Sequence, residues 1–165
     1  MNRKTPAAAP RASAQQNRSR SPVSANLADP AGVALSRQLH EVAAALQEIR
    51  RGRSGTAVLE RVPTALRPGV QSLLFQVLRA LGWAEAVRQQ LAPRAPAPAV
   101  DALLCTALAL LADEEHLPYT PFTLVNQAVQ AAKQALATRA QAPFINACLR
   151  RFLGERGALQ QAVAG

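Results

Sequence analysis

The chain has little of what builds β-sheets. Only 4% of its 165 residues are aromatic, whereas 49% are apolar and most of these are Ala and Leu. β-Branched and polar residues nowhere alternate in a run, and no Asn-Gly pair marks a hairpin turn. The composition therefore argues against strands and favours helices, in a chain long enough for one domain with its own core.

Long apolar runs are also lacking. The longest, Ala102 to Ala112, is too short to span a bilayer. Arg3 and Lys4 have no apolar segment behind them, so we expect no secretory signal, no membrane partner and a cytoplasmic location. Residues 1–33 hold Ala, Pro, Ser and Arg, and such a segment is expected to be disordered and to act as an electrostatic tether. An organellar transit peptide is the alternative for this acid-poor segment.

Groups that carry out catalysis or bind metals are scarce. Cys105 and Cys148 have no partner at metal-ligand spacing, and we interpret them as small core residues in a reducing compartment. His40 and His116 lie far apart and are interpreted as structural or solvated. The acidic residues 113–115 would fan out around a helix end, so a solvated face is favoured over a metal site. We expect no metal, no cofactor and no catalysis by this chain alone.

Positive charge, in contrast, is abundant. The chain has 19 Lys and Arg against 10 Asp and Glu, a formal net charge of +9. Residues 1–33 hold five of the cations and one acid, so +4 belongs to the tail and +5 to the remainder. A basic remainder predicts an anionic partner, and nucleic acid is the commonest one.

Apolar residues recur at helical spacing over residues 34–156, which predicts an all-α, compact bundle of about seven helices. The helices are expected over about 35–50, 56–61, 68–81, 83–91, 98–112, 121–136 and 143–152. The fifth is apolar nearly all round and should be central. Thr120 is a good N-cap for the sixth, whose buried stripe runs on to Leu136, and residues 157–165 should fray. Trp83 is interpreted as a core side chain rather than a base-stacking platform.

A Gly/Ser loop with three arginines follows the first expected helix, at Arg50-Arg51-Gly52-Arg53-Ser54-Gly55. The helix macrodipole favours arginine near a helix C-terminus, which accounts for Arg50 and Arg51 but not for Arg53. A flexible loop of this kind suits phosphate contacts. A structural role and RNA contact both stay open for this loop.

Four segments resemble the NusB-like domain family: the first helix with its loop, and three short motifs. Phe144 to Arg150 resembles the family's F-[IV]-N-G-V-L-R, and Val125 to Lys133 resembles V-N-E-A-V-E-x-A-K. Phe75 to Arg79 resembles [FY]-G-V-[LV]-R of the methyltransferase branch. The chain departs from these motifs at Gln76, Gln127, Gln130 and Ala147.

The family includes the transcription antitermination factor NusB and the N-terminal domain of 16S rRNA cytosine methyltransferases of the RsmB type. The resemblance implies an RNA-binding domain that helps position ribosomal RNA. The methyltransferase's catalytic domain is not expected within this chain, because no Gly-rich loop follows a strand and neither cysteine follows a proline. A protein-interaction module remains an alternative, with outward apolar residues of the fourth and fifth helices docking on a ribosomal protein or a separate methyltransferase domain. A truncated remnant is a third possibility.

The candidate RNA-binding residues are arginines expected to face outward. They are Arg37, Arg50, Arg51, Arg53, Arg79, Arg150 and Arg151. A guanidinium group binds phosphate through two parallel hydrogen bonds and stacks on unpaired bases. For Arg79 and Arg150 the alternative is a salt bridge to Glu41, Glu48 or Glu85, which would contribute little stability at the surface.

Overall fold

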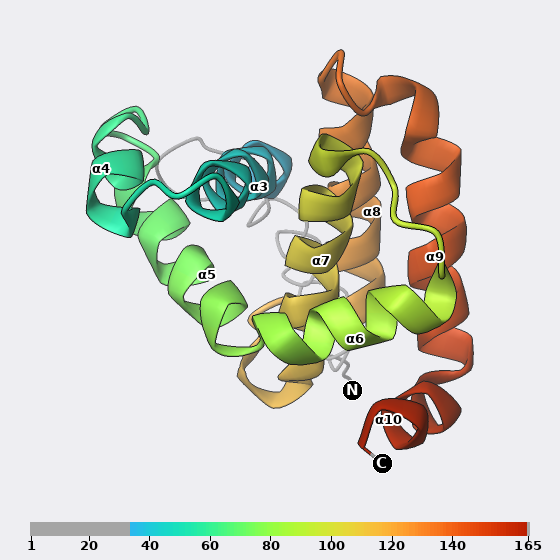
Figure 1. Ribbon diagram of the computed structural model, residues 1–165. Coiled ribbons are helices and arrows are strands. Elements are labelled where there is room, and N and C mark those ends of the chain that lie inside the picture. The colour runs from blue at the N-terminus through green and yellow to red at the C-terminus, as the bar shows by residue number, and fades with distance from the viewer. Residues whose placement is uncertain (1–33, 165) are drawn as a thin grey trace, which may run out of the picture. The chain divides into compact units, whose positions relative to one another are not determined.

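The computed structural model describes residues 34–164, and this part of the chain is all-α (Figure 1). The disordered tail expected for residues 1–33 lies outside the described residues, as does Gly165. The described part of the chain contains α3 (Leu35–Arg50), α4 (Gly55–Glu60), α5 (Arg67–Arg79), α6 (Leu81–Leu91), α7 (Pro98–Ala112), η2 (Glu114–His116), α8 (Pro121–Gln134), η3 (Arg139–Gln141), α9 (Ala142–Gly154) and α10 (Arg156–Ala164). The predicted fold class is therefore confirmed, with one α-helix more than the seven expected.

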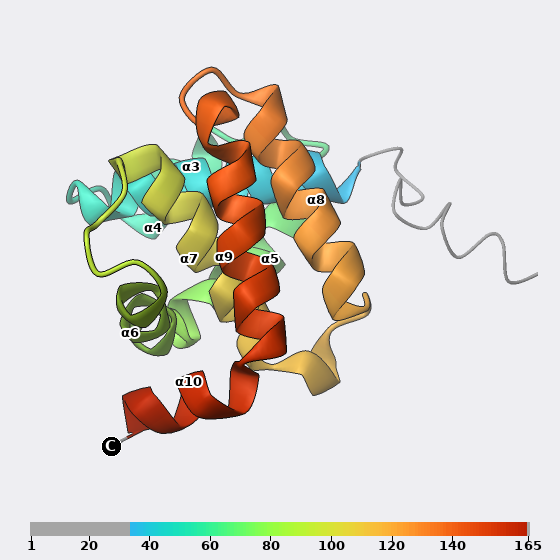
Figure 2. The same ribbon diagram turned by 90° about the vertical axis from the view of Figure 1, so that its right-hand side faces the viewer.

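Helix α7 is the central helix, as its sequence predicted. Every residue from Ala102 to Leu111 is buried, because an uninterrupted run of apolar residues has no side to turn toward water. The helix packs against α5, α6, α8 and α9, which surround it in both views (Figures 1 and 2). Within residues 34–164, no helix is both long and apolar enough to cross a membrane.

Helices α8 and α9 pack side by side and run antiparallel, joined through η3 (Figure 2). Helix α8 begins as predicted, because the Thr120 hydroxyl accepts a hydrogen bond from the Thr123 N–H at 3.2 Å. The prediction that Leu136 continues the buried stripe is wrong, since its side chain is 85% exposed. The helix already ends at Gln134, so the helical periodicity no longer applies two residues later.

The C-terminal residues form a helix, although we expected residues 157–165 to fray and the domain to end at 156. Helix α10 packs on α6 and α9 and buries Leu159 to 5% exposure. The Arg156 guanidinium lies 5.1 Å from the centroid of the Phe152 ring and donates to the Leu111 carbonyl. A helix this short is marginal alone, so these contacts are what keep it ordered.

Trp83 packs against a core side chain, as predicted, but it is not itself fully buried. It is half-buried, and its ring meets that of Phe152 edge to face, with centroids 5.7 Å apart and an interplanar angle of 85°. Phe152 itself is fully buried. This aromatic pair joins α6 to α9, and α10 closes over it through Arg156.

Candidate nucleic-acid interface

Gly52, two residues after the end of α3, turns the chain away from the helix within the arginine loop. Its φ of +102° lies in the left-handed region, where glycine has no Cβ to clash and is the usual residue after a helix end. The Gly52 N–H donates to the Ile49 carbonyl at 2.9 Å, and the Arg53 N–H donates to the Glu48 carbonyl at 3.1 Å. The loop is therefore a closed helix end with defined backbone bonds.

Glu48 forms ion pairs with three arginines, two of which belong to this loop. Its carboxylate lies 3.0 Å from Arg51, 2.8 Å from Arg53 and 3.9 Å from Arg61. One negative charge thus faces three positive ones, so this group of four side chains has a formal charge of +2. The side chains of Arg51 and Arg53 remain 60% and 48% exposed. Ion pairs this exposed are weak, and a phosphate can compete for both guanidinium groups.

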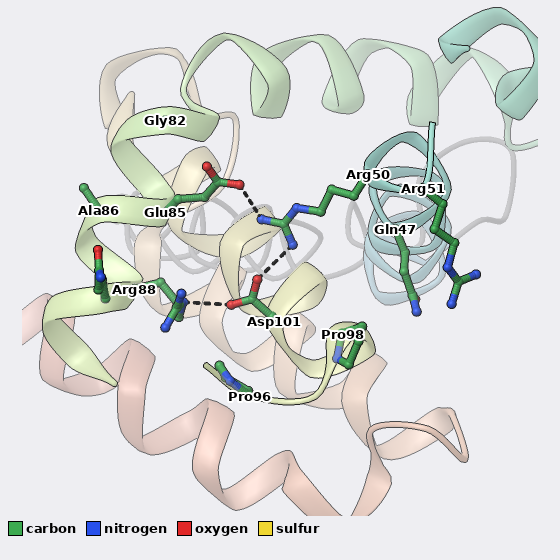
Figure 3. Close-up of a pocket in the computed structure, with 11 residues that line it drawn as sticks. Gln47, Arg50, Arg51, Gly82, Glu85, Ala86, Arg88, Pro96, Pro98 and Asp101 are labelled. Carbon is green, nitrogen blue, oxygen red and sulfur yellow. Dashed lines mark hydrogen bonds and ion pairs between the residues drawn. The ribbon is translucent and has the colours of Figure 1, made fainter. Parts of the chain in front are cut away.

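Arg50 has a different environment, because two carboxylates from other helices hold it (Figure 3). It lies 2.7 Å from Glu85 of α6 and 2.9 Å from Asp101 of α7, and Asp101 also lies 2.8 Å from Arg88. Partial burial disfavours the charged form of Arg50, but the hydrogen bond to Glu85 and the charge of Asp101 outweigh burial and raise its pKa. Arg50 therefore fastens α3 to α6 and α7, and is less free for RNA than the loop arginines.

An open hollow of about 730 Å³ lies beside this chain of ion pairs. Gln47 of α3 and Arg51, which directly follows α3, border it on one side, and Glu85 and Arg88 of α6 border it on the other (Figure 3). Arg50, Arg51 and Arg88 face two acids here, so the lining is only weakly basic. Sequence reasoning missed Arg88, because nothing in the spacing of the chain indicated that it would meet Asp101.

Cys105 lies at the inner end of the same cluster, where its thiol donates to Asp101 Oδ1 at 3.8 Å. Burial, together with the negative charge of Asp101, raises the pKa of the Cys105 thiol to about 11. The thiol is therefore protonated at neutral pH, and only the thiolate is nucleophilic. Burial also raises the pKa of Cys148. Both cysteines are free and buried, as interpreted from the sequence.

We expect Cys105 to resist alkylation by iodoacetamide in the native protein at mildly alkaline pH. Two effects protect it, a raised pKa and a fully buried side chain. Mass spectrometry of native and urea-unfolded samples would measure the labelling rate at each cysteine. Cys148 is the internal comparison, because it is 7% exposed and should react sooner than Cys105. Fast labelling of Cys105 without unfolding would contradict its assigned environment.

The remaining candidate arginines lie on other elements. Arg37 is exposed in the first turn of α3, and Arg79 is exposed at the end of α5. Arg151 Nε lies 3.3 Å from Glu155 on α9's C-terminal side. Helices α5 and α9 lie on different sides of α7 (Figures 1 and 2). The seven predicted residues therefore do not make one patch.

Arg150 contacts amides rather than acids. Its Nε donates to Asn146 Oδ1 at 3.0 Å, and its Nη2 donates to Asn126 Oδ1 at 3.5 Å. The salt bridges considered for Arg79 and Arg150 do not form, because Glu48 and Glu85 pair with other arginines. The positive charges of both residues are uncompensated within the part that the structure describes.

Six exposed cations lack an ion-pair partner among residues 34–164. They are Arg37, Arg79, Arg94, Lys133, Arg139 and Arg150. Sequence reasoning missed three of these, Arg94, Lys133 and Arg139. A signal for the last two was present, since residues 117–154 contain four Lys and Arg and no Asp or Glu. No group of three His, Cys, Asp or Glu side chains among the residues that the structure describes is arranged to hold a metal ion.

Comparison with known proteins leaves these surfaces without a counterpart. No protein-family model, no curated protein and no solved structure matches the chain. What the protein does must therefore be inferred from its own charge and geometry.

Proposed function

We propose that this chain is an RNA-binding module of the NusB-like kind, which positions ribosomal RNA in the cytoplasm and carries no catalytic domain of its own. The observation that supports the proposal is the set of six exposed cations that have no ion-pair partner within residues 34–164, in a part of the chain with a formal charge of +5. Such cations can bind phosphate without first breaking an ion pair. The resemblance of four segments to the NusB-like family supports the same function.

Titration of labelled ribosomal RNA fragments at several salt concentrations tests the proposal. Each phosphate contacted on a single strand should contribute about −0.7 to the slope of log K against log salt concentration. Absence of binding at low salt would contradict the proposed function.

The arginine loop makes a separate contribution that can be measured. We expect the double variant Arg51→Gln/Arg53→Gln to make the salt slope shallower by about 1.4, because two phosphate contacts are lost. Arg61→Gln is the matched control: it removes one charge from the same Glu48 cluster but lies outside the loop. An unchanged slope in the double variant, or the same change per charge in the control, would show that the loop does not contact RNA.

A protein-interaction module is the second candidate function. The expected patch on the fourth and fifth helices is not formed, since α7 is buried and the apolar side chains Val87 and Leu91 of α6 face inward. Large apolar side chains are exposed elsewhere, at Phe75, Phe122 and Leu136. Recovery of a ribosomal protein or a methyltransferase domain after nuclease treatment would favour this function over RNA binding.

A further inference from the structure

Helices α8 and α9 and the connection between them contain no carboxylate. The NusB-like motif has two acids where this chain has Gln127 and Gln130. Gln127 still ties α8 to α3, because its Oε1 accepts a hydrogen bond from the Ser36 N–H at 3.0 Å. Gln130 is exposed. Both replacements remove negative charge that would repel a polyanion, while Lys133, Arg139 and Arg150 stay positive.

Arg150 is positioned on this surface by two neutral side chains. The amide oxygens of Asn146 and Asn126 accept its hydrogen bonds at 3.0 Å and 3.5 Å. The guanidinium is thus oriented without a carboxylate to compensate its charge, unlike Arg50, which lies between two acids. Because the oxygens of both amides accept from Arg150, their NH₂ groups are left to donate. The cluster therefore offers mainly N–H groups, which suit phosphate oxygens and the carbonyls of bases.

An exposed aromatic ring lies on the same stripe of α8. Phe122 precedes Asn126 by four residues, and Lys133 follows Asn126 by seven, so all three share one face of the helix. Phe122 is 60% exposed, although the chain has only six aromatic residues with which to build a core. Exposed aromatic rings beside arginine are what unpaired bases stack on.

We infer that Phe122, Asn126, Lys133, Asn146 and Arg150, the α8–α9 face, bind single-stranded RNA, with an unpaired base stacked on Phe122 and an adjacent phosphate on Arg150 (Figure 2 shows the two helices). The inference rests on the proposed RNA-binding function and gives it a surface and a substrate class. A single strand is assigned rather than a duplex, because paired bases are already stacked and offer Phe122 no free ring face.

Binding of the full-length chain to labelled oligouridylate, and to an oligoadenylate–oligouridylate duplex of equal length, tests this assignment by fluorescence anisotropy. Phe122→Ala should weaken binding of the single strand roughly tenfold and leave the salt slope unchanged, because it removes stacking but no charge. Arg150→Gln should make the salt slope shallower by about 0.7. Duplex binding should be insensitive to Phe122→Ala.

Each variant has a control with the same chemical change elsewhere. Phe75→Ala removes an exposed ring from α5. Arg151→Gln removes a charge from α9 whose guanidinium is held by Glu155 and also donates to the Leu91 carbonyl of α6. Both controls should bind oligouridylate like the wild type, and circular dichroism melting of all four variants verifies folding. If the wild type binds oligouridylate but Phe122→Ala and Arg150→Gln bind equally well, the α8–α9 face is overturned and the proposed function stands. If the wild type binds neither probe nor ribosomal RNA, the proposed function itself fails.

Discussion

Replacing Phe152 by Ala is expected to lower the free energy of unfolding by about 3–5 kcal/mol. The side chain is fully buried, so the substitution removes its transfer free energy and leaves a cavity. The effect should spread beyond α9, because the ring meets Trp83 of α6 at 5.7 Å and lies under Arg156 of α10 at 5.1 Å. Loss of Phe152 therefore loosens the junction of three helices, and α10 should be the first to detach.

Urea unfolding would measure this change, with fluorescence of the chain's one tryptophan as the probe. Phe75→Ala is the matched control, since the Phe75 ring is 46% exposed and its removal should cost less than about 1 kcal/mol. Hydrogen exchange adds a local readout, in which the amides of α10 should lose protection in Phe152→Ala before those of α7. Equal stability losses for the two variants would contradict the assigned core.

Asp101→Asn is expected to cost about 2–3 kcal/mol, although it changes no volume. The carboxylate faces Arg50 at 2.9 Å and Arg88 at 2.8 Å, and the side chains of Asp101 and Arg88 are only 15% and 14% exposed. A neutral amide would leave Arg88 partly buried without a counter-charge. Since Arg50 would keep Glu85, the cost should fall below that of breaking a fully buried pair.

Glu155→Gln provides the comparison for Asp101→Asn. The substitution is of the same kind, but Glu155 and its partner Arg151 are 52% and 48% exposed, so the loss should be at most about 0.5 kcal/mol. Thermal unfolding of the two variants at low and moderate salt measures both. A similar, salt-sensitive loss in both variants would show that the cluster around Asp101 is an ordinary surface ion pair. In that case Arg50 would also count among the cations that are available to bind phosphate.

The ion pairs of Arg50 have a consequence for RNA-binding experiments. Substituting Arg50 removes a fastening between three helices together with a charge, so a loss of RNA affinity would have two causes. Arg51 and Arg53 hold only Glu48 and lie at the surface. Substituting Arg51 or Arg53 therefore removes a charge without removing a link between helices, so a loss of RNA affinity can be assigned to a phosphate contact.

Helices that carry an apolar pattern at helical spacing could be predicted from the sequence. The apolar stripes and the prolines at first helical positions located the seven predicted helices, because both act within one or two turns. The C-terminal helix could not be predicted in this way. Its apolar pattern is short, with Leu159 and Val163 as the only large apolar side chains, and only Leu159 is buried. Its order depends on the surfaces of α6 and α9, which are distant in sequence.

For the candidate site, too, some features follow from the sequence and others depend on the tertiary structure. That the chain is basic outside its first 33 residues, and that residues 117–154 have no acid, are properties of the sequence alone. Which arginines pair with an acid and which do not was decided by the tertiary structure. Arg50 meets the acid Asp101 across 51 positions, whereas Arg150 meets the neutral Asn126 across 24. Charge adds along a chain and needs no fold, whereas pairing acts over a few ångströms. Only the fold, which places Arg50 of α3 beside acids of α6 and α7 and packs α8 against α9, brings such partners within that range.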